Sequence, residues 1–321
     1  MAKKPKEHKR IAWNTVQPKE VSFLWHPYIP FGKISILCGD SGLGKTTLAL
    51  DIVSRLTTGR QMPLSDSEPI TGSTLFQSNE DEISDTLLPR CINAGADLSK
   101  IESIDCEGLN IDDDCAIIEH HIKETNARFL LLDPLQSFVG RNADMSRITD
   151  IRRLLSNLGA IAARNDCAAL VIAHQSKGHN TNELHKVFGS VDITATARSV
   201  LRISKSEYDP EIRVLSHIKS STTRPAPPLA FRIEHNSQIV YLGEYDSDSD
   251  DTAYEIPDDN SKRAKAIEII NAMLQDGPCE GTEIFAACSE AGISARTVER
   301  VKKELNIRSG RDGIRHIWHS E

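Results

Sequence analysis

The most regular feature of the chain is a series of short apolar runs, each followed by a segment with helical spacing of its apolar residues. The runs lie at residues 33–38, 73–78, 129–133 and 168–173. Runs with little polar interruption are typical of strands that are buried on both faces of a sheet. The alternation of strand and helix therefore predicts a mostly parallel sheet with helices on both sides.

Between the runs, apolar residues recur with the period of amphipathic helices. The helices predicted in this way cover residues 46–56, 83–94, 113–125 and 147–164. Beyond residue 199 the pattern changes to short strands with no helix between them. These strands are predicted at residues 199–204, 212–218, 230–233 and 238–242. The fold class we expect is α/β, with antiparallel strands extending the parallel sheet.

An acidic segment at residues 244–261 interrupts this pattern. It contains no Lys or Arg and few apolar residues, which is the composition of a solvated linker. We therefore expect an N-terminal arm at 1–30, a body at 31–243, this linker, and a small domain at 262–321. A linker of this kind predicts few contacts across the boundary, so that the body would fold without the tail.

The composition is that of an ordinary globular protein. Of 321 residues, 39% are hydrophobic and 26% are charged, which excludes a wholly disordered chain. No run approaches 18 apolar residues, and the basic N-terminus lacks the apolar run of a signal peptide. We therefore expect a cytoplasmic protein without a membrane partner. The net charge of −8 excludes indiscriminate coating of nucleic acid, so any DNA contact must use local basic patches.

Residues 39–46 read G-D-S-G-L-G-K-T and match G-x-x-x-x-G-K-[ST] at every fixed position, between a predicted strand and a predicted helix. Such a loop wraps the phosphates of ATP with backbone N–H groups at a helix N-terminus. Lys45 is expected to reach the β- and γ-phosphates, and Thr46 to offer its hydroxyl to Mg²⁺. The expected nucleotide-binding residues are Gly39, Asp40, Ser41, Gly42, Leu43, Gly44, Lys45, Thr46 and Thr47.

Polar side chains follow three of the other predicted strands. Asp133 ends an apolar strand, where a carboxylate would hold Mg²⁺ together with Thr46. Glu80 follows the second strand and is the candidate for orienting or deprotonating water, with Asp81 and Glu82 as alternatives. His174 follows the fourth strand, where it would sense the γ-phosphate. Because the carboxyl ends of parallel strands converge on one crevice, we expect these side chains to lie close together.

These motifs, in this order, resemble the RecA-like ATPases, and more narrowly the plasmid RepA-type hexameric replicative helicases and related phage AAA-family ATPases. The resemblance covers residues 31–242 and rests on G-D-S-G-L-G-K-T, N-E-D, L-L-L-D-P, H-Q-S-K, and a G-S pair followed eight residues later by Arg198. It implies that Glu80 is the catalytic base, that His174 lies by the γ-phosphate, and that Arg198 reaches the neighbouring subunit's nucleotide. Lys219 and Arg224 are the other candidates for that role. Asn79 stands where the family usually has glycine.

The tail resembles a winged-helix module. Helices are predicted at residues 263–274, 281–291 and 294–305, followed by a β-wing at 307–319, with Ser294 as the N-cap of the third helix. Arg296, Arg300 and Lys303 fall on one face of that helix and are candidates for contact with duplex DNA. The alternative is a winged helix that binds protein, or a basic face that is merely solvated.

The function that the resemblance implies is a ring-forming, DNA-stimulated ATPase that translocates on DNA, as a replicative helicase of a plasmid, phage or integrated element. The ring would be a hexamer with single-stranded DNA in its pore. The pore candidates for phosphate contact are Arg141, Arg147, Lys177 and Lys186. The alternative is an ATP-switched regulator or loader that binds DNA without unwinding it. A small-molecule kinase is disfavoured because the sequence contains no apparent acceptor-binding lid.

Overall fold

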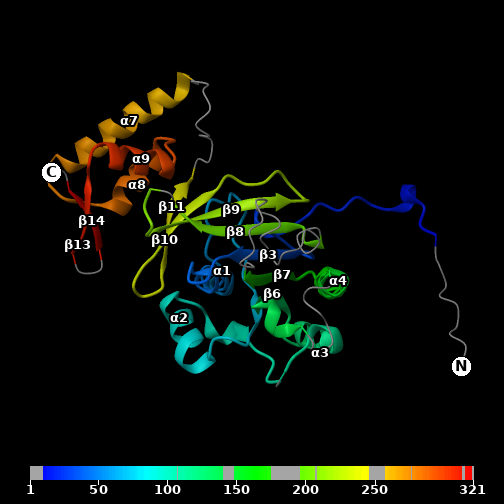
Figure 1. The fold of residues 1–321 in the computed structure, drawn as a ribbon. Coiled ribbons are helices and arrows are strands. Elements are labelled where there is room, and N and C mark those ends of the chain that lie inside the picture. The colour runs from blue at the N-terminus through cyan, green and yellow to red at the C-terminus, as the bar shows by residue number, and fades with distance from the viewer. Residues whose placement is uncertain are drawn as a thin grey trace, which may run out of the picture.

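The computed structural model describes residues 10–106, 108–139, 148–174, 196–206, 208–245, 257–275, 277–312 and 315–319. In this part of the chain, the body is built on one nine-stranded sheet with the strand order β11-β10-β9-β8-β3-β7-β6-β4-β5 (Figure 1). The parallel strands are β3 (Ile34–Gly39), β4 (Ser73–Ser78), β5 (Ile101–Glu102), β6 (Ala127–Asp133), β7 (Ala168–His174) and β8 (Ser199–Lys205).

Antiparallel strands extend this sheet beyond β8. They are β9 (Ile212–Ser220), β10 (Leu229–Ile233) and β11 (Ile239–Glu244). The expected α/β fold, with a mostly parallel sheet extended by antiparallel strands, is therefore confirmed.

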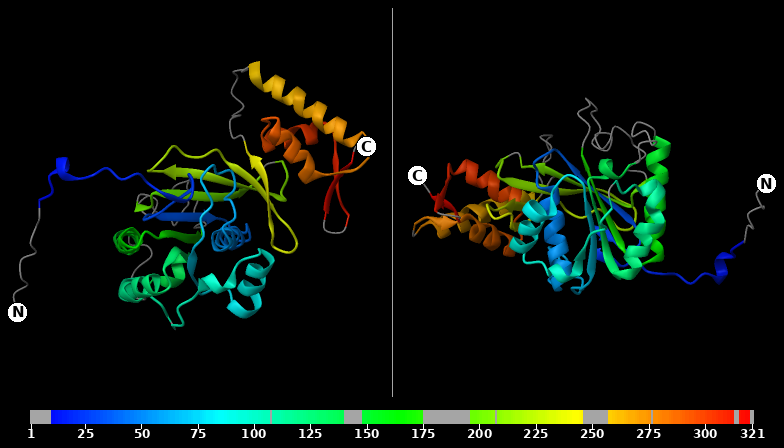
Figure 2. Two further views of the ribbon diagram at one scale, coloured as in Figure 1. Left: turned by 180° about the vertical axis from the view of Figure 1, so that it is seen from behind. Right: turned by 90° about the horizontal axis from the view of Figure 1, so that it is seen from below.

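Helices cover both faces of the sheet (Figure 2). They are α1 (Lys45–Thr58) and α2 (Leu88–Asn93) on one face, and α3 (Ile111–Glu124) and α4 (Ile148–Arg164) on the other. Alternate residues of β6 belong to the two cores, since Leu131 packs with α1 whereas Leu130 packs with α3 and α4. Two-sided burial explains why this strand has an unbroken apolar sequence. The helix predicted at 83–94 is divided into a π-helical turn at Ile83–Leu87 and α2.

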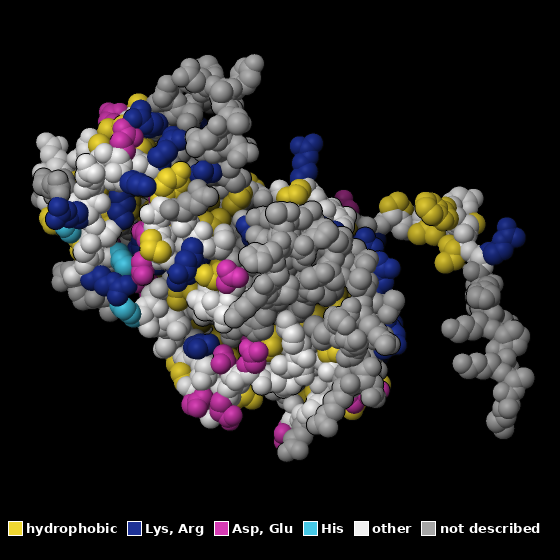
Figure 3. Space-filling view, viewed as in Figure 1, with side chains coloured by type: hydrophobic (Ala, Val, Ile, Leu, Met, Phe, Trp, Pro, Cys, Tyr) yellow, Lys and Arg dark blue, Asp and Glu magenta, His cyan; other side chains and the backbone are white. Residues whose placement is uncertain are grey.

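The body begins before residue 31. Strands β1 (Phe23–Trp25) and β2 (Ile29–Pro30) form a small antiparallel pair, and the Trp25 ring is fully buried, with Nε1 donating to the Pro63 carbonyl at 2.9 Å. Residues 10–20 are exposed in contrast, and the Trp13 side chain is 92% exposed. Apolar side chains are visible on this extended segment in Figure 3.

The tail forms a second unit, which we call the C-terminal module (residues 257–319). It contains α7 (Pro257–Leu274), β12 (Cys279–Glu280), α8 (Gly281–Glu290), α9 (Ala295–Glu304), β13 (Arg308–Asp312) and β14 (Arg315–His319), and its sheet order is β12-β14-β13. The Ser294 hydroxyl accepts a hydrogen bond from the Thr297 N–H at 3.3 Å, as expected of an N-cap. The helix α7 begins inside the segment predicted as linker. Assignment of the module as a winged helix stays a prediction.

The expectation of few contacts between body and module is wrong. One apolar cluster contains Ile212 and Ala230 of the sheet together with Ile270, Val298 and Trp318 of the module. The physical reason is that the composition of a linker reports the solvation of the linker itself. It carries no information about the surfaces on either side of it. Here the antiparallel end of the sheet has an apolar face, and the module covers it.

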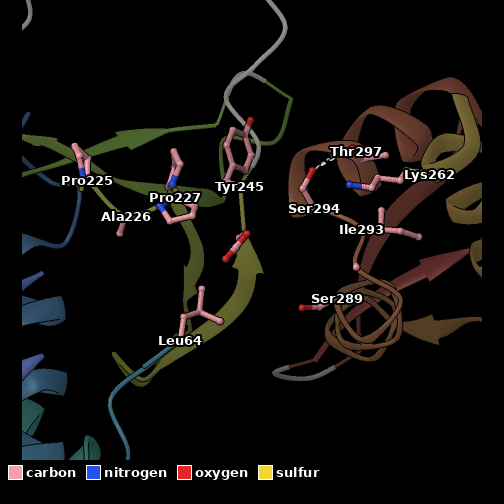
Figure 4. Close-up of a pocket in the computed structure, with 13 residues that line it drawn as sticks. Leu64, Pro225, Ala226, Pro227, Tyr245, Lys262, Ser289, Ile293, Ser294 and Thr297 are labelled. Atoms are coloured by element: carbon pink, nitrogen blue, oxygen red, sulfur yellow. Dashed lines mark hydrogen bonds between the residues drawn. The ribbon is translucent and has the colours of Figure 1, made fainter. Parts of the chain in front are cut away.

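A cleft lies beside this packed contact. It has a volume of about 640 Å³ and is lined by residues 225–228, Tyr245, Lys262 and Ile293, so that its walls come from both units (Figure 4). The junction is therefore tightly packed in one part and open in another. Within the described residues, no helix is long and apolar enough to cross a membrane.

Candidate active site

The phosphate-binding loop lies between β3 and α1, and its glycines are required by the surrounding structure. Gly44 has a φ of +85°, and a Cβ there would lie 2.1 Å from Cδ1 of Ile233. A Cβ on Gly39 would lie 2.6 Å from the carbonyl oxygen of Ile203. A side chain at either position would displace β8 or β10, so the loop holds its shape because the sheet packs directly against it.

The N-terminus of α1 opens onto this loop. The helix begins at Lys45, and its first backbone hydrogen bond runs from the Leu48 N–H to the Gly44 carbonyl at 2.9 Å. The earlier N–H groups of an α-helix have no acceptor within the helix, and the helix dipole places positive potential there. The loop and helix therefore form an anion site of the kind that holds phosphate.

The Lys45 ammonium is held against the loop. Its Nζ donates to the carbonyl oxygens of Gly39 and Asp40, both at 2.9 Å, and the residue is 5% exposed. Burial lowers the pKa of Lys45, and the nearby Asp133 carboxylate acts in the opposite direction. A phosphate oxygen that replaced the two carbonyls would meet a desolvated ammonium group, with which its interaction is strong.

Thr46 and Asp133 are brought together as predicted for a Mg²⁺ site. The Thr46 hydroxyl donates to Oδ2 of Asp133 at 2.6 Å, and Asp133 is 5% exposed at the end of β6. The two residues come from the start of α1 and the end of β6, which places a hydroxyl oxygen and a carboxylate oxygen side by side. Both are ligand types that Mg²⁺ prefers.

Glu80 lies just beyond β4, on the same edge of the sheet. Ser78 pairs with Asp133 in the sheet register, and the Glu80 carboxylate raises the pKa of Lys45, which shows that it is close to the loop. Glu80 is exposed. Of the alternatives, Asp81 forms an ion pair with Arg90 at 3.1 Å, whereas Glu82 is exposed at the start of the π-helical turn.

Asn79 has a role that the sequence did not indicate. Its backbone N–H donates to the Asp133 carbonyl at 3.3 Å, and its side-chain Nδ2 donates to the Ser137 carbonyl at 3.2 Å. The residue that stands in place of glycine therefore ties the end of β4 to the segment that follows β6. This connection fixes the backbone of Glu80 relative to Asp133.

His174 ends β7 and pairs in register with Gly39, so its backbone lies at the edge of the sheet that carries the loop. The conformation of its side chain lies outside the description. The pore candidates Arg141, Arg147, Lys177 and Lys186 also lie outside the described residues.

Arg198 lies at the opposite edge of the sheet. Its N–H donates to the Ile34 carbonyl at 2.9 Å, at the start of β3, whereas the loop begins at Gly39. Five residues of strand correspond to about 17 Å. Arg198 is exposed and, with Lys33 and Arg152, lines a hollow of about 420 Å³. Arg198 is thus separated from the nucleotide site of its own chain.

The other two finger candidates lie nearby in sequence. Lys219 shares this edge with Arg198, because its Nζ donates to the Ala197 carbonyl at 2.8 Å. Burial and the charge of Arg198 both lower the pKa of Lys219. Arg224 is exposed beyond the end of β9.

The DNA candidates of α9 are placed unequally. Arg296 is half-buried, with its guanidinium carbon 5.8 Å from the centre of the Tyr208 ring, and Arg300 is also half-buried. Lys303 is exposed. The face of α9 that was expected to meet DNA is therefore partly used in the junction with the body.

A buried polar group at this junction was missed by sequence reasoning. Glu299 of α9 is 2% exposed, and its carboxylate accepts from the Ser206 hydroxyl at 2.7 Å. The same hydroxyl lies 3.0 Å from the Tyr245 hydroxyl. Burial raises the pKa of Glu299 to about 7. Nothing in a helix rich in Arg, Lys and Glu distinguishes this glutamate from its exposed neighbours.

The chain is similar to known proteins in family and in fold. A family model described as an AAA domain matches residues 3–180. No curated protein matches the chain. Among solved structures, the ATPase domain of a helicase is similar in fold, with a TM-score of 0.51 and 14% sequence identity, over 65% of this chain and 84% of that chain. At this identity the likeness shows the fold alone.

Proposed function

Since the chain belongs to the AAA-domain family and its body has a RecA-like P-loop ATPase fold, we propose that it is a ring-forming, DNA-stimulated ATPase that translocates on DNA. The proposal includes the role of a replicative helicase of a plasmid, phage or integrated element. The observation that carries it is the division of catalytic groups between two edges of the sheet. Lys45, Thr46 and Asp133 lie at one edge, and Arg198 lies at the other.

The first edge supplies the residues that bind ATP. The loop at residues 39–46 and the start of α1 surround the phosphates, and Lys45 exchanges its carbonyl partners for phosphate oxygens. Thr46 and Asp133 would hold Mg²⁺, for which a hydroxyl and a carboxylate oxygen are suitable ligands. When bound, that ion neutralises charge on the β- and γ-phosphates.

Glu80 then acts as the general base. A water oxygen forms a bond to the γ-phosphorus while the bond from that phosphorus to the bridging oxygen of ADP breaks. The Glu80 carboxylate accepts the proton that the water loses. Asn79 supports this role, because its two hydrogen bonds fix the segment that carries Glu80 relative to Asp133.

The second edge serves a neighbouring subunit. In a head-to-tail ring every interface joins two different surfaces of the same chain, so an arginine about 17 Å from its own loop reaches the loop of the next chain. There the Arg198 guanidinium stabilises the charge that develops on the transferred phosphoryl group. A hexamer is the ring that the resemblance favours.

A second candidate function rests on the placement of α9. Its arginines are partly engaged at the junction and Glu299 is buried there. This placement favours an ATP-switched regulator or loader in which the module binds DNA or a protein only after it leaves the body. A motor and a switch differ in what they do to a duplex.

The experiment supplies a forked DNA duplex, ATP and Mg²⁺, and measures strand separation. The motor separates the strands, and Glu80→Gln, which keeps the phosphate contacts, binds the fork without separating it. If the wild-type protein hydrolyses ATP and binds the fork but leaves it paired, the helicase proposal is wrong and the switch is favoured. Loss of ATP hydrolysis stimulation by single-stranded DNA would contradict both.

A further inference from the structure

The guanidinium of Arg232 is buried without an acceptor. Arg232 lies in β10 and is 1% exposed, and within the described residues its Nε and Nη1 donate no hydrogen bond. An arginine keeps its charge at any pH at which the protein is folded. Burial of a charge without a partner is strongly unfavourable. A ligand that supplies acceptor oxygens would remove this cost.

Arg232 also lines a cavity. The cavity has a volume of about 460 Å³ and lies between the β10–β11 hairpin and the C-terminal module. The hairpin contributes Arg232, Glu234 and Gln238 to its wall, and the module contributes Glu280, Thr282 and His316. Although two carboxylates belong to this wall, no described carboxylate forms an ion pair with Arg232.

The neighbouring basic groups show that positive charge is in excess around this position. Burial lowers the pKa of Lys302, and the charge of Arg232 lowers it further, although Asp209 and Glu299 act in the opposite direction. Burial likewise lowers the pKa of His316, as do Arg232 and Arg311, against Glu234 and Glu211. His316 is thus disfavoured as a second cation by Arg232, so an added anion would favour its protonation.

We propose that this junction cavity binds a small molecule through an oxyanion, a carboxylate or a phosphate, that accepts hydrogen bonds from the Arg232 guanidinium. Arginine offers several N–H donors in one plane, which suits both groups. Thr282 and Gln238 supply neutral hydrogen-bonding groups for the rest of the ligand. A DNA backbone is excluded as the source because Arg232 is almost wholly covered, whereas the Glu234 and Glu280 carboxylates favour a ligand of low total charge.

Binding at this place would strengthen the contact between body and module. Because the cavity wall is formed by both, a ligand that fills it binds only when the module is docked, and mass action then favours the docked state. The proposal does not depend on the activity of the ATPase site, which lies at a different part of the body.

The test uses the full chain carrying Lys45→Ala, so that phosphate binding at the loop of residues 39–46 is weakened. Thermal unfolding is followed in sodium chloride, sodium acetate and sodium phosphate at equal ionic strength. We expect acetate or phosphate to raise the melting temperature in a saturable manner, and the anion that does so identifies the group. A further Arg232→Met change should abolish the rise while keeping or increasing the melting temperature in chloride.

Two controls separate this result from general effects. Lys205→Met removes an exposed cation from β8 and should leave the anion effect unchanged. Thr282→Val keeps the buried charge, so it remains informative if Arg232→Met does not fold, and it should weaken the anion at least about threefold. Nuclear magnetic resonance titration of His316, assigned with His316→Gln, should show a higher pKa in the stabilising anion.

Two results would overturn the proposal. A saturable rise that persists in Arg232→Met would place the anion at another site. Equal melting temperatures in the three salts, together with an unchanged His316 titration, would show that Arg232 is buried without any ligand. Neither result bears on ATP hydrolysis, which is measured separately in the chain with Lys45 intact.

Discussion

Replacing Glu299 with glutamine should make the protein more stable at pH 8 and change it little at pH 5. The carboxylate is 2% exposed at the junction, where burial raises its pKa from 4.5 to about 7. Asp209 adds to this effect, while hydrogen bonds from Ser206 and Tyr245 and the charge of Lys302 oppose it. The amide of glutamine keeps the size and an acceptor oxygen without the charge.

The sign follows from the two pKa values. Below pH 4.5 the carboxyl is protonated in both the folded and the unfolded chain, so its ionisation costs nothing. As the pH rises toward 7 the unfolded chain releases the proton and the folded chain retains it, which lowers the free energy of unfolding. Each pH unit between the two values corresponds to about 1.4 kcal/mol, so the loss is about 3 kcal/mol, most of it between pH 5 and 7.

The assay is urea unfolding at pH 5, 6, 7 and 8 for the wild-type protein, Glu299→Gln and Glu290→Gln. Glu290 is an exposed glutamate at the end of α8 and serves as the matched control. We expect the difference between Glu299→Gln and wild type to grow by about 2 to 3 kcal/mol from pH 5 to pH 8, and the control to show no such growth. A constant difference at all four pH values would refute the reasoning.

Three other changes address the ATPase and the module. Glu80→Gln should bind ATP with wild-type affinity and lose hydrolysis, because the phosphate contacts remain while the water loses its base; retained turnover, measured by phosphate release, would exclude Glu80. Arg198→Ala and Lys45→Ala should each be inactive, whereas a one-to-one mixture with subunit exchange restores about a quarter of the interfaces. Activity that stays absent in confirmed mixed rings would leave Arg198 without a role between subunits. Deletion of residues 257–321 should make the body aggregate, since it uncovers the sheet face around Ile212 and Ala230; a monomeric, folded product in gel filtration would contradict this.

The fold of the body was predictable because its strands are buried on both faces. In β6 and β7 almost every side chain is apolar, and this leaves no other arrangement than a covered parallel strand. The position of Lys45, Thr46 and Asp133 was predictable for a related reason, since parallel strands place their carboxyl ends at one edge.

The junction was not predictable from the sequence. Whether β10 faces solvent or the module depends on contacts between segments about 60 residues apart, which local periodicity does not report. Arg232 and Glu299 illustrate this point, because both have the residue type of a surface position and both are buried. Arg198 is intermediate. Its motif was visible, but its separation from the loop became clear only from the register of β3 and β8.

The apolar cluster that crosses from sheet to module has a consequence for the order of synthesis. Strands β9, β10 and β11 leave the ribosome before α7, α8 and α9, which cover them. At about 5 to 20 residues per second, the roughly 75 residues that follow β11 take several seconds to be made. During that interval the face around Ile212, Ala230 and Leu242 is exposed, and a holdase chaperone or the neighbouring nascent chain on the same message would compete with the module for it.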